Sequence, residues 1–287
     1  MIRSPAVAGP FYSPSAATLE AEVAGCLDRS AQPKPMLAAI SPHAGLMYSG
    51  PVAGAVYSRI TLPATVILIG PNHTGSGPAV SVYPTGAWRM PGGEVSVNQN
   101  LAAEILARCP CAEADTTAHQ REHCLEVQLP FLQHRRRPIQ IVPIVLGIRD
   151  PALCQAIGEC LAAILAQHTT MEGGQPLLVA STDMNHYESD AITRTKDRHA
   201  LDAIERLDPH ALDAAVTTHS ISMCGIAPTL AVLHAARALG ATRATLVRYA
   251  TSADQGGDHA RVVGYAGFTI EPPDASHRAM FITHENV

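Results

Sequence analysis

Five short runs of nearly unbroken aliphatic residues are the feature that most limits how this chain can fold. They are residues 36–40, 64–69, 139–146, 177–180 and 245–249. The runs are continuously apolar rather than alternating, which is typical of strands that are buried on both faces. Strands of this kind form parallel sheets covered by helices on both sides. The pattern therefore predicts an α/β fold.

Helical stretches separate these predicted strands. Asn98 is a suitable N-cap for a helix over 99–108, and Pro151 suits the first turn of a helix over 151–168. Further helices are predicted over 51–60, 122–134, 190–206 and 226–238. A hairpin is expected over 80–97, around Pro91-Gly92-Gly93. Without repeats or linkers, we expect one domain over residues 1–272, with a mostly parallel central sheet flanked by helices, and a polar tail over 273–287.

Composition excludes several classes of protein. The chain has 287 residues, of which 47% are hydrophobic and 16% charged, too apolar for a disordered protein. Its net charge of −5 gives no basic surface for nucleic acid, and Arg135 to Arg137 beside Pro138 are interpreted as a solvated turn. The aliphatic runs are too short to cross a bilayer, and no apolar leader is visible. We therefore expect a cytoplasmic protein that binds neither membrane nor nucleic acid.

The seven cysteines include no CxxC pair. In a reducing compartment most of them should be small buried thiols, and Cys154 and Cys160 fit this interpretation within their predicted helix. Cys224 differs because it directly precedes Gly225 and the helix over 226–238. A helix N-terminus favours the thiolate, which is the form that binds metal or attacks carbonyl groups.

Histidines follow three of the predicted strands. His43 follows the run at 36–40, His73 follows 64–69 and His186 follows 177–180. Ligands of open α/β sheets bind beyond the carboxyl ends of the strands, and these ends converge at one edge. The sequence therefore predicts a site at this edge, to which Cys224 is a fourth candidate contributor.

Two chemical interpretations compete for these residues. In the first, His43, His73 and Cys224 bind one metal ion and leave coordination positions open. Imidazole and thiolate ligands suit Fe(II), Cu or Zn. His186 then acts as acid or base, and Asp183 orients it or holds a water. In the second, Cys224 is the nucleophile of a hydrolase with His186 as base and Asp183 as orienter. That alternative leaves His43 and His73 without a role and ranks lower.

The segment from His119 to His123 matches the H-x-x-E-H pattern of inverted zinc peptidases. The preceding residues are typical of a turn, however, and a helix is expected to begin only near Glu122. We therefore expect Glu122 and His123 to support the site from its surroundings rather than to act as primary ligands.

Several of these motifs occur together in a fixed order. They are residues 5–12, 41–45 with 48–50, 70–73, 122–130, 181–186 and 224–225. In this order they resemble the Memo family, known in bacteria and archaea as AmmeMemoRadiSam system protein B. The resemblance covers roughly residues 1 to 270.

This resemblance implies a fold similar to that of the LigB-type class III extradiol dioxygenases, which are non-haem Fe(II) enzymes. The metal ligands of the family map onto His43, His73 and Cys224, and the acid/base histidine of the dioxygenases maps onto His186. Asp183 falls beside the pocket, and Phe11 and Tyr48 match positions expected to wall it. The family is associated with iron or copper, and its bacterial members with AMMECR-type and radical SAM proteins.

One departure limits what the resemblance implies. The third ligand in the dioxygenases is a carboxylate, whereas Cys224 stands at that place here. A thiolate prefers softer metals, so ring cleavage does not follow from the fold. We expect a metal-dependent oxidoreductase of unknown substrate, with Fe(II) as the first choice of metal. The alternatives are a non-catalytic copper- or iron-binding module that holds a small molecule or peptide in its pocket, and the Cys-His-Asp hydrolase.

Overall fold

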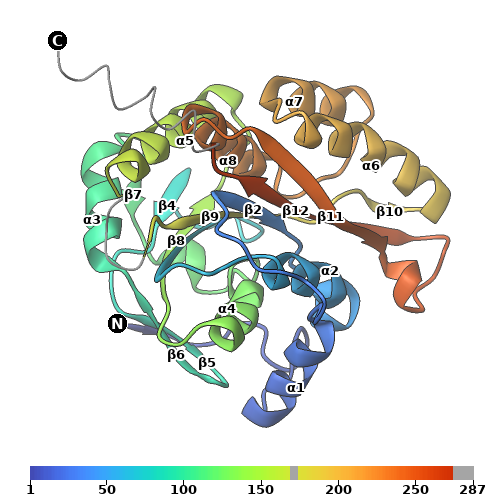
Figure 1. Ribbon diagram of the computed structural model, residues 1–287, viewed down its shortest axis with the longest axis horizontal. Helices are drawn as coiled ribbons and strands as arrows, with labels where there is room; N and C mark the ends of the chain where they lie inside the picture. The colour runs from blue at the N-terminus through green and yellow to red at the C-terminus, as the bar shows by residue number, and fades with distance from the viewer. Residues whose placement is uncertain (169–173, 274–287) are drawn as a thin grey trace.

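Parallel strands form the centre of the sheet in residues 1–168 and 174–273, which the computed structural model describes (Figure 1). Their order is β6 (Gly93–Val97), β8 (Gln140–Leu146), β3 (Thr65–Pro71), β9 (Leu177–Ser181) and β2 (Ala38–Ser41). Every residue of β3, β9 and β2 is buried, and only Gln140 of β8 is exposed. These four strands are the first four predicted runs, so the α/β fold class is confirmed.

Antiparallel strands extend the sheet beyond β2. There β12 (Val262–Glu271) pairs with β2, and it also pairs with β11 (Arg243–Thr251) and β10 (His186–Glu188). The fifth predicted run lies in β11, where the expected burial on both faces is wrong because much of the strand is only half-buried. Strand β12 was not predicted. Its apolar run is interrupted by Gly264 and Gly267, and at Gly267 a Cβ would lie 2.4 Å from a methyl carbon of Val56.

Helices cover both faces of this sheet. One layer contains α1 (Ala16–Cys26), α2 (Leu46–Ser58) and α4 (Leu129–Arg135), which contact one another. The other contains α3 (Gln99–Arg108), α5 (Pro151–Leu165) and α8 (Ile226–Ala238), with α6 (Asp190–Glu205) and α7 (Pro209–Thr218) beside it (Figure 1). Two of these helices, α1 and α7, lie outside the predicted ranges.

Local sequence signals predicted the starts of two helices correctly. Asn98 caps α3 by accepting a hydrogen bond from the Leu101 amide, and Pro151 begins α5. The helix predicted over 122–134 begins later, with a 3₁₀ turn at Glu126–Gln128 before α4. The helix predicted from residue 51 begins at Leu46 instead.

The predicted hairpin over 80–97 is only partly formed. β5 (Ala87–Met90) and β6 pair as a hairpin, and β1 (Ile2–Arg3) adds in parallel to β5. β4 (Val80–Val82) pairs instead with β8 and with β7 (Glu113–Ala114). The first part of the hairpin prediction was wrong because β4 has a better partner far away in sequence.

Cys160 is not the reduced thiol that its sequence context predicted. It forms a disulfide with Cys109, with a distance of 5.8 Å between the two Cα atoms. Cys109 lies at the end of α3, which packs on α5, and the 51-residue separation hides this pairing from local patterns. Cys154 remains a free, buried thiol, as expected.

No helix of the described residues is long and apolar enough to cross a membrane. Except for residue 273, the predicted polar tail lies outside the described residues.

Candidate metal centre

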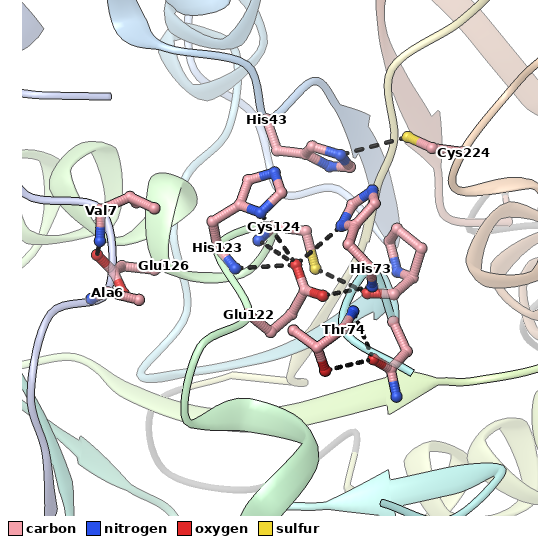
Figure 2. Close-up of polar contacts among 12 residues, drawn as sticks. Ala6, Val7, His43, His73, Thr74, Glu122, His123, Cys124, Glu126 and Cys224 are labelled. Atoms are coloured by element: carbon pink, nitrogen blue, oxygen red, sulfur yellow. Dashed lines mark hydrogen bonds and ion pairs between the residues drawn. The ribbon is translucent and has the colours of Figure 1, made fainter. Parts of the chain in front are cut away.

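Two strand ends and one helix start bring His43, His73 and Cys224 together. His43 follows β2, His73 follows β3 and Cys224 precedes α8. One potential ligand atom from each residue lies within 4.8 Å of the others, and the Cys224 Sγ is 3.3 Å from the His43 Nε2 (Figure 2). The arrangement that the sequence predicted at this sheet edge is therefore present.

Buried hydrogen bonds determine which ring nitrogen of His43 faces the site. Its Nδ1 lies 2.9 Å from the Ser181 Oγ, whose hydroxyl donates to the Cys124 carbonyl oxygen at 2.7 Å. Gln128 Nε2 donates to the Ser181 Oγ at 2.9 Å. Because the Ser181 hydrogen is already used, His43 Nδ1–H is the donor and its Nε2 keeps a lone pair. Burial lowers the pKa of His43 and favours this neutral form.

Glu122 fixes the ring of His73. The carboxylate is 1% exposed and accepts from the His73 Nδ1 at 2.9 Å and from the backbone amides of His73, His123 and Cys124 (Figure 2). Burial alone would raise the pKa of Glu122, but these hydrogen bonds, led by that from His73, lower it to about 2. An ionised carboxylate only accepts, so His73 donates through Nδ1. Burial lowers the pKa of His73, but the hydrogen bond and charge of Glu122 outweigh it and raise that pKa, so a metal ion at Nε2 competes with a proton there.

The surroundings of Cys224 favour the thiol over the thiolate. Burial, and next the nearby Asp183 charge, raise the pKa of the thiol, although Gly225 caps the following helix. The expected activation by the helix N-terminus is therefore wrong, because desolvation outweighs the helix dipole here. At neutral pH the thiol form is favoured until a cation replaces its proton.

Asp183 and His186 take positions that the sequence predicted only in part. The Asp183 carboxylate is buried and accepts from the His43 backbone amide at 2.8 Å, while its own amide donates to the Cys224 Sγ at 3.2 Å. Asp183 thus joins the two ligand segments. The ring of His186 is held instead by Ser222, whose carbonyl oxygen lies 2.9 Å from Nδ1.

These contacts correct two hypotheses. Ser222, and not Asp183, orients His186, because the chain turns after β9 and points the two side chains differently. The Cys224–His186–Asp183 triad is not assembled in the part of the chain that the structure describes, since the imidazole beside the thiol belongs to His43.

The H-x-x-E-H segment forms no peptidase site. His119 lies in a 3₁₀ turn, Thr117–His119, is fully buried and contacts the Ser81 hydroxyl at 2.9 Å through Nε2. The His123 ring stacks on His73 with 4.7 Å between ring centroids. The two histidines cannot share a helix face because no continuous helix connects them.

A cavity of about 590 Å³ is lined by two of the three candidate metal ligands, His43 and His73. Asp183, His186 and the expected wall residues Phe11 and Tyr48 also line it. The Phe11 ring lies 4.9 Å from that of His123. Tyr187, Asp258 and Arg261, which also line the cavity, were not predicted.

The N-terminal arm that carries Phe11 is fixed by a buried ion pair. Arg3 Nη1 lies 2.6 Å from a carboxylate oxygen of Glu126, and both side chains are fully buried. Arg3 Nη2 also donates to the Glu122 carbonyl oxygen at 2.5 Å, while Glu126 accepts from the amides of Ala6 and Val7 (Figure 2). The arm is thus attached to the segment that holds His73. No local sequence pattern revealed this contact, because it joins residues 119 and 123 positions apart.

Comparison with known proteins gives consistent matches along the chain. Residues 3–269 match the profile of a family described as Memo-like protein. A MEMO1 family protein from Methanopyrus kandleri is 36% identical over 284 residues, covering 94% of this chain and 99% of the relative. One from Aquifex aeolicus is 39% identical over 269 residues, covering 93% and 98%. The crystal structure of an uncharacterized Escherichia coli K12 protein superposes with a TM-score of 0.55 at 11% identity, covering 82% of this chain and 99% of that one, which shows similarity of fold.

Proposed function

Because this chain belongs to the Memo-like protein family, we propose that it is a metal-binding protein centred on His43, His73 and Cys224, with oxidoreductase activity on a small molecule. One observation carries this proposal. Both imidazoles donate through Nδ1 to buried acceptors, which leaves each Nε2 as the potential ligand atom, and the Cys224 thiol lies beside them. Hydrogen bonds of this kind orient histidines that bind metals.

The donor set fits a transition metal. Two imidazoles and a thiolate suit Fe(II), Cu or Zn and are poor ligands for Mg or Ca. We propose Fe(II) as the resident ion, with Cu or Zn as alternatives. Three protein ligands leave positions for a small molecule, whereas structural zinc sites are closed by four.

The protein's own groups would position the reactants and move a proton. A bound metal would supply Lewis-acid or redox chemistry. His186 donates through Nδ1 to the Ser222 carbonyl oxygen, so its Nε2 can accept a proton from a molecule in the cavity. Asp183 links the backbone of His43 to the thiol of Cys224, and Phe11 and Tyr48 line the cavity.

Metal storage without catalysis is the second candidate function, and Cys224 is the observation that favours it. A thiolate in place of a carboxylate favours Cu(I), and it can be oxidised if dioxygen binds nearby. A peptide or small molecule in the cavity would then be a bound partner rather than a substrate. Association with AMMECR-type and radical SAM proteins, and a cytoplasmic location, stay predictions from the family resemblance and the sequence.

Anaerobic purification followed by elemental analysis tests the metal centre. We expect about one transition metal ion per wild-type chain. Cys224→Ala should lose most of it, whereas Cys111→Ala, which removes a half-buried free thiol outside the centre, should keep it. Wild-type protein without stoichiometric metal, or full occupancy in Cys224→Ala, would contradict the proposal.

Dioxygen consumption separates the two candidates. The oxidoreductase should consume dioxygen in the presence of a suitable reductant substrate, and His186→Ala should slow turnover without removing the metal. The storage protein should bind Cu(I) tightly and consume no dioxygen with any substrate tested.

A further inference from the structure

Tyr187 stands at the mouth of the cavity in an unusual backbone conformation. Its φ is 64°, in the left-handed region, and the pairing of β10 with β12 shifts register between His186 and Glu188. Side chains of a regular strand alternate between two faces, but this bulge lets His186 and Tyr187 both line the cavity.

The fold gains little from tyrosine at this position. A left-handed conformation strains a bulky residue such as tyrosine, and burial of an aromatic ring could offset the strain. The Tyr187 side chain is 66% exposed, however, so its own packing does not. Strained residues at the edge of a cavity point to a role in binding.

Arg261 lies beside this ring. Its guanidinium carbon is 5.7 Å from the centroid of the Tyr187 ring, and both residues line the cavity. Arg261 is the one lysine or arginine among the described residues that line it. Asp258, the acidic residue at the same mouth, uses a carboxylate oxygen to accept from the Ala260 amide and forms no ion pair with Arg261 within the described residues.

We propose that Tyr187 and Arg261 form a rim subsite that binds the anionic end of a planar aromatic ligand whose other end reaches the metal centre. The guanidinium would pair with a carboxylate through two parallel hydrogen bonds, and the ligand ring would pack on Tyr187. This inference rests on the proposed function, because the same cavity leads to His43 and His73.

A matched pair of probes tests the subsite. The anaerobically purified protein is titrated with 4-methylbenzoate and with the neutral isostere 4-methylbenzamide, and binding is followed by calorimetry and saturation-transfer NMR. We expect the acid to bind about tenfold more tightly, since one charge-assisted pair is worth roughly that factor. Arg261→Gln should abolish the preference. Arg243→Gln, an exposed arginine at the opposite end of the β11–β12 ladder, should retain it.

Tyr187→Asn provides a test that does not depend on charge. Asparagine tolerates the left-handed region, so the thermal midpoint should stay unchanged or rise while both probes bind more weakly. A purely structural tyrosine predicts a lower midpoint with unchanged binding. Equal binding of acid and amide to the wild type, or a preference that survives Arg261→Gln, would overturn the proposal.

Metal content measured on the same samples separates this inference from the proposed function. Wild-type protein without metal but with an Arg261-dependent preference for the acid contradicts the metal centre and supports the subsite. Full metal content with no such preference contradicts the subsite alone.

Discussion

Two buried carboxylates lie behind different histidines of the cavity, and their pKa values shift in opposite directions. Glu122, behind His73, accepts four hydrogen bonds, and its pKa falls to about 2. Asp197, in α6 behind His186, accepts from the Tyr249 hydroxyl at 2.7 Å and the Asn185 amide at 3.0 Å. Burial dominates there and raises the pKa of Asp197 to about 6. The number of donors, and not burial alone, decides whether a carboxylate stays ionised.

This contrast matches two different tasks. His73 contacts an ionised carboxylate directly, which fixes one tautomer and one orientation, as a metal ligand needs. His186 is held by the neutral carbonyl of Ser222, and Asn185 supports Ser222 by accepting from its amide at 3.1 Å. Asp197, the ionisable group on this side, contacts the backbone amide of Asn185 and not the ring of His186. His186 is thus oriented without a direct charge partner, which suits a group that gains and loses a proton.

We expect the largest effect on metal affinity and stability when Glu122 loses its charge. Glu122→Gln places a donor among four donors, so metal affinity should fall by about 10–100-fold. The free energy of unfolding should fall by about 2–3 kcal/mol because the amide group that replaces one carboxylate oxygen cannot accept from the buried donor that faces it, and the negative charge is lost. Metal titration and urea unfolding measure both. Glu94→Gln, in an exposed ion pair with Arg89, should change stability by less than about 0.5 kcal/mol. Unchanged metal affinity in Glu122→Gln would remove Glu122 from the centre.

Acid unfolding sharpens the comparison. The folded-state pKa of Glu122 lies below its unfolded value, so its contribution is present above about pH 4.5 and lost as the pH falls towards 2. A shift of this size corresponds to roughly 3 kcal/mol. We expect the wild type to lose this stability over that range and Glu122→Gln to lose much less. Parallel pH dependences in urea unfolding would contradict the assignment.

Asp197 should show the reverse sign and a smaller effect. Its folded-state pKa is raised, so ionisation above about pH 6 destabilises the fold and protonation relieves it. Between pH 8 and pH 5 this group should add roughly 1 kcal/mol to the free energy of unfolding. Asp197→Asn should remove that component, and comparison of the two pH profiles measures it. A component that survives the substitution belongs to another group.

The smallest effect is expected for Ser222→Ala. The hydroxyl accepts from the His186 amide at 2.7 Å, but the ring contact uses the backbone carbonyl, which alanine keeps. Metal content should not change, and stability should fall by about 1 kcal/mol. Nitrogen-15 NMR of the imidazole should still report a protonated Nδ1. A switch of tautomer would show that the hydroxyl, rather than the carbonyl, sets the orientation.

Local patterns revealed the residues of the site but not their supports. His43, His73 and His186 were found because each follows a buried strand, and parallel strand ends converge. The supporting roles of Ser181, Gln128 and Ser222 were missed, since these roles depend on contacts across 36 to 138 positions of sequence. The pKa of Cys224 was predicted in the wrong direction because a sequence shows a helix start but not the depth of burial. The Cys109–Cys160 disulfide and β12 were missed for the same reason, as both are set by long-range packing.

Cobalt titration of the metal-free protein tests the central claim most directly, because Co(II) bound to a thiolate gives a ligand-to-metal charge-transfer band in the near ultraviolet. If His43, His73 and Cys224 share one metal ion, the band should saturate at about one equivalent in wild type. It should vanish in Cys224→Ser, and binding should weaken strongly in His43→Ala and His73→Ala. A wild-type spectrum without the band, or a band that persists in Cys224→Ser, would contradict the account.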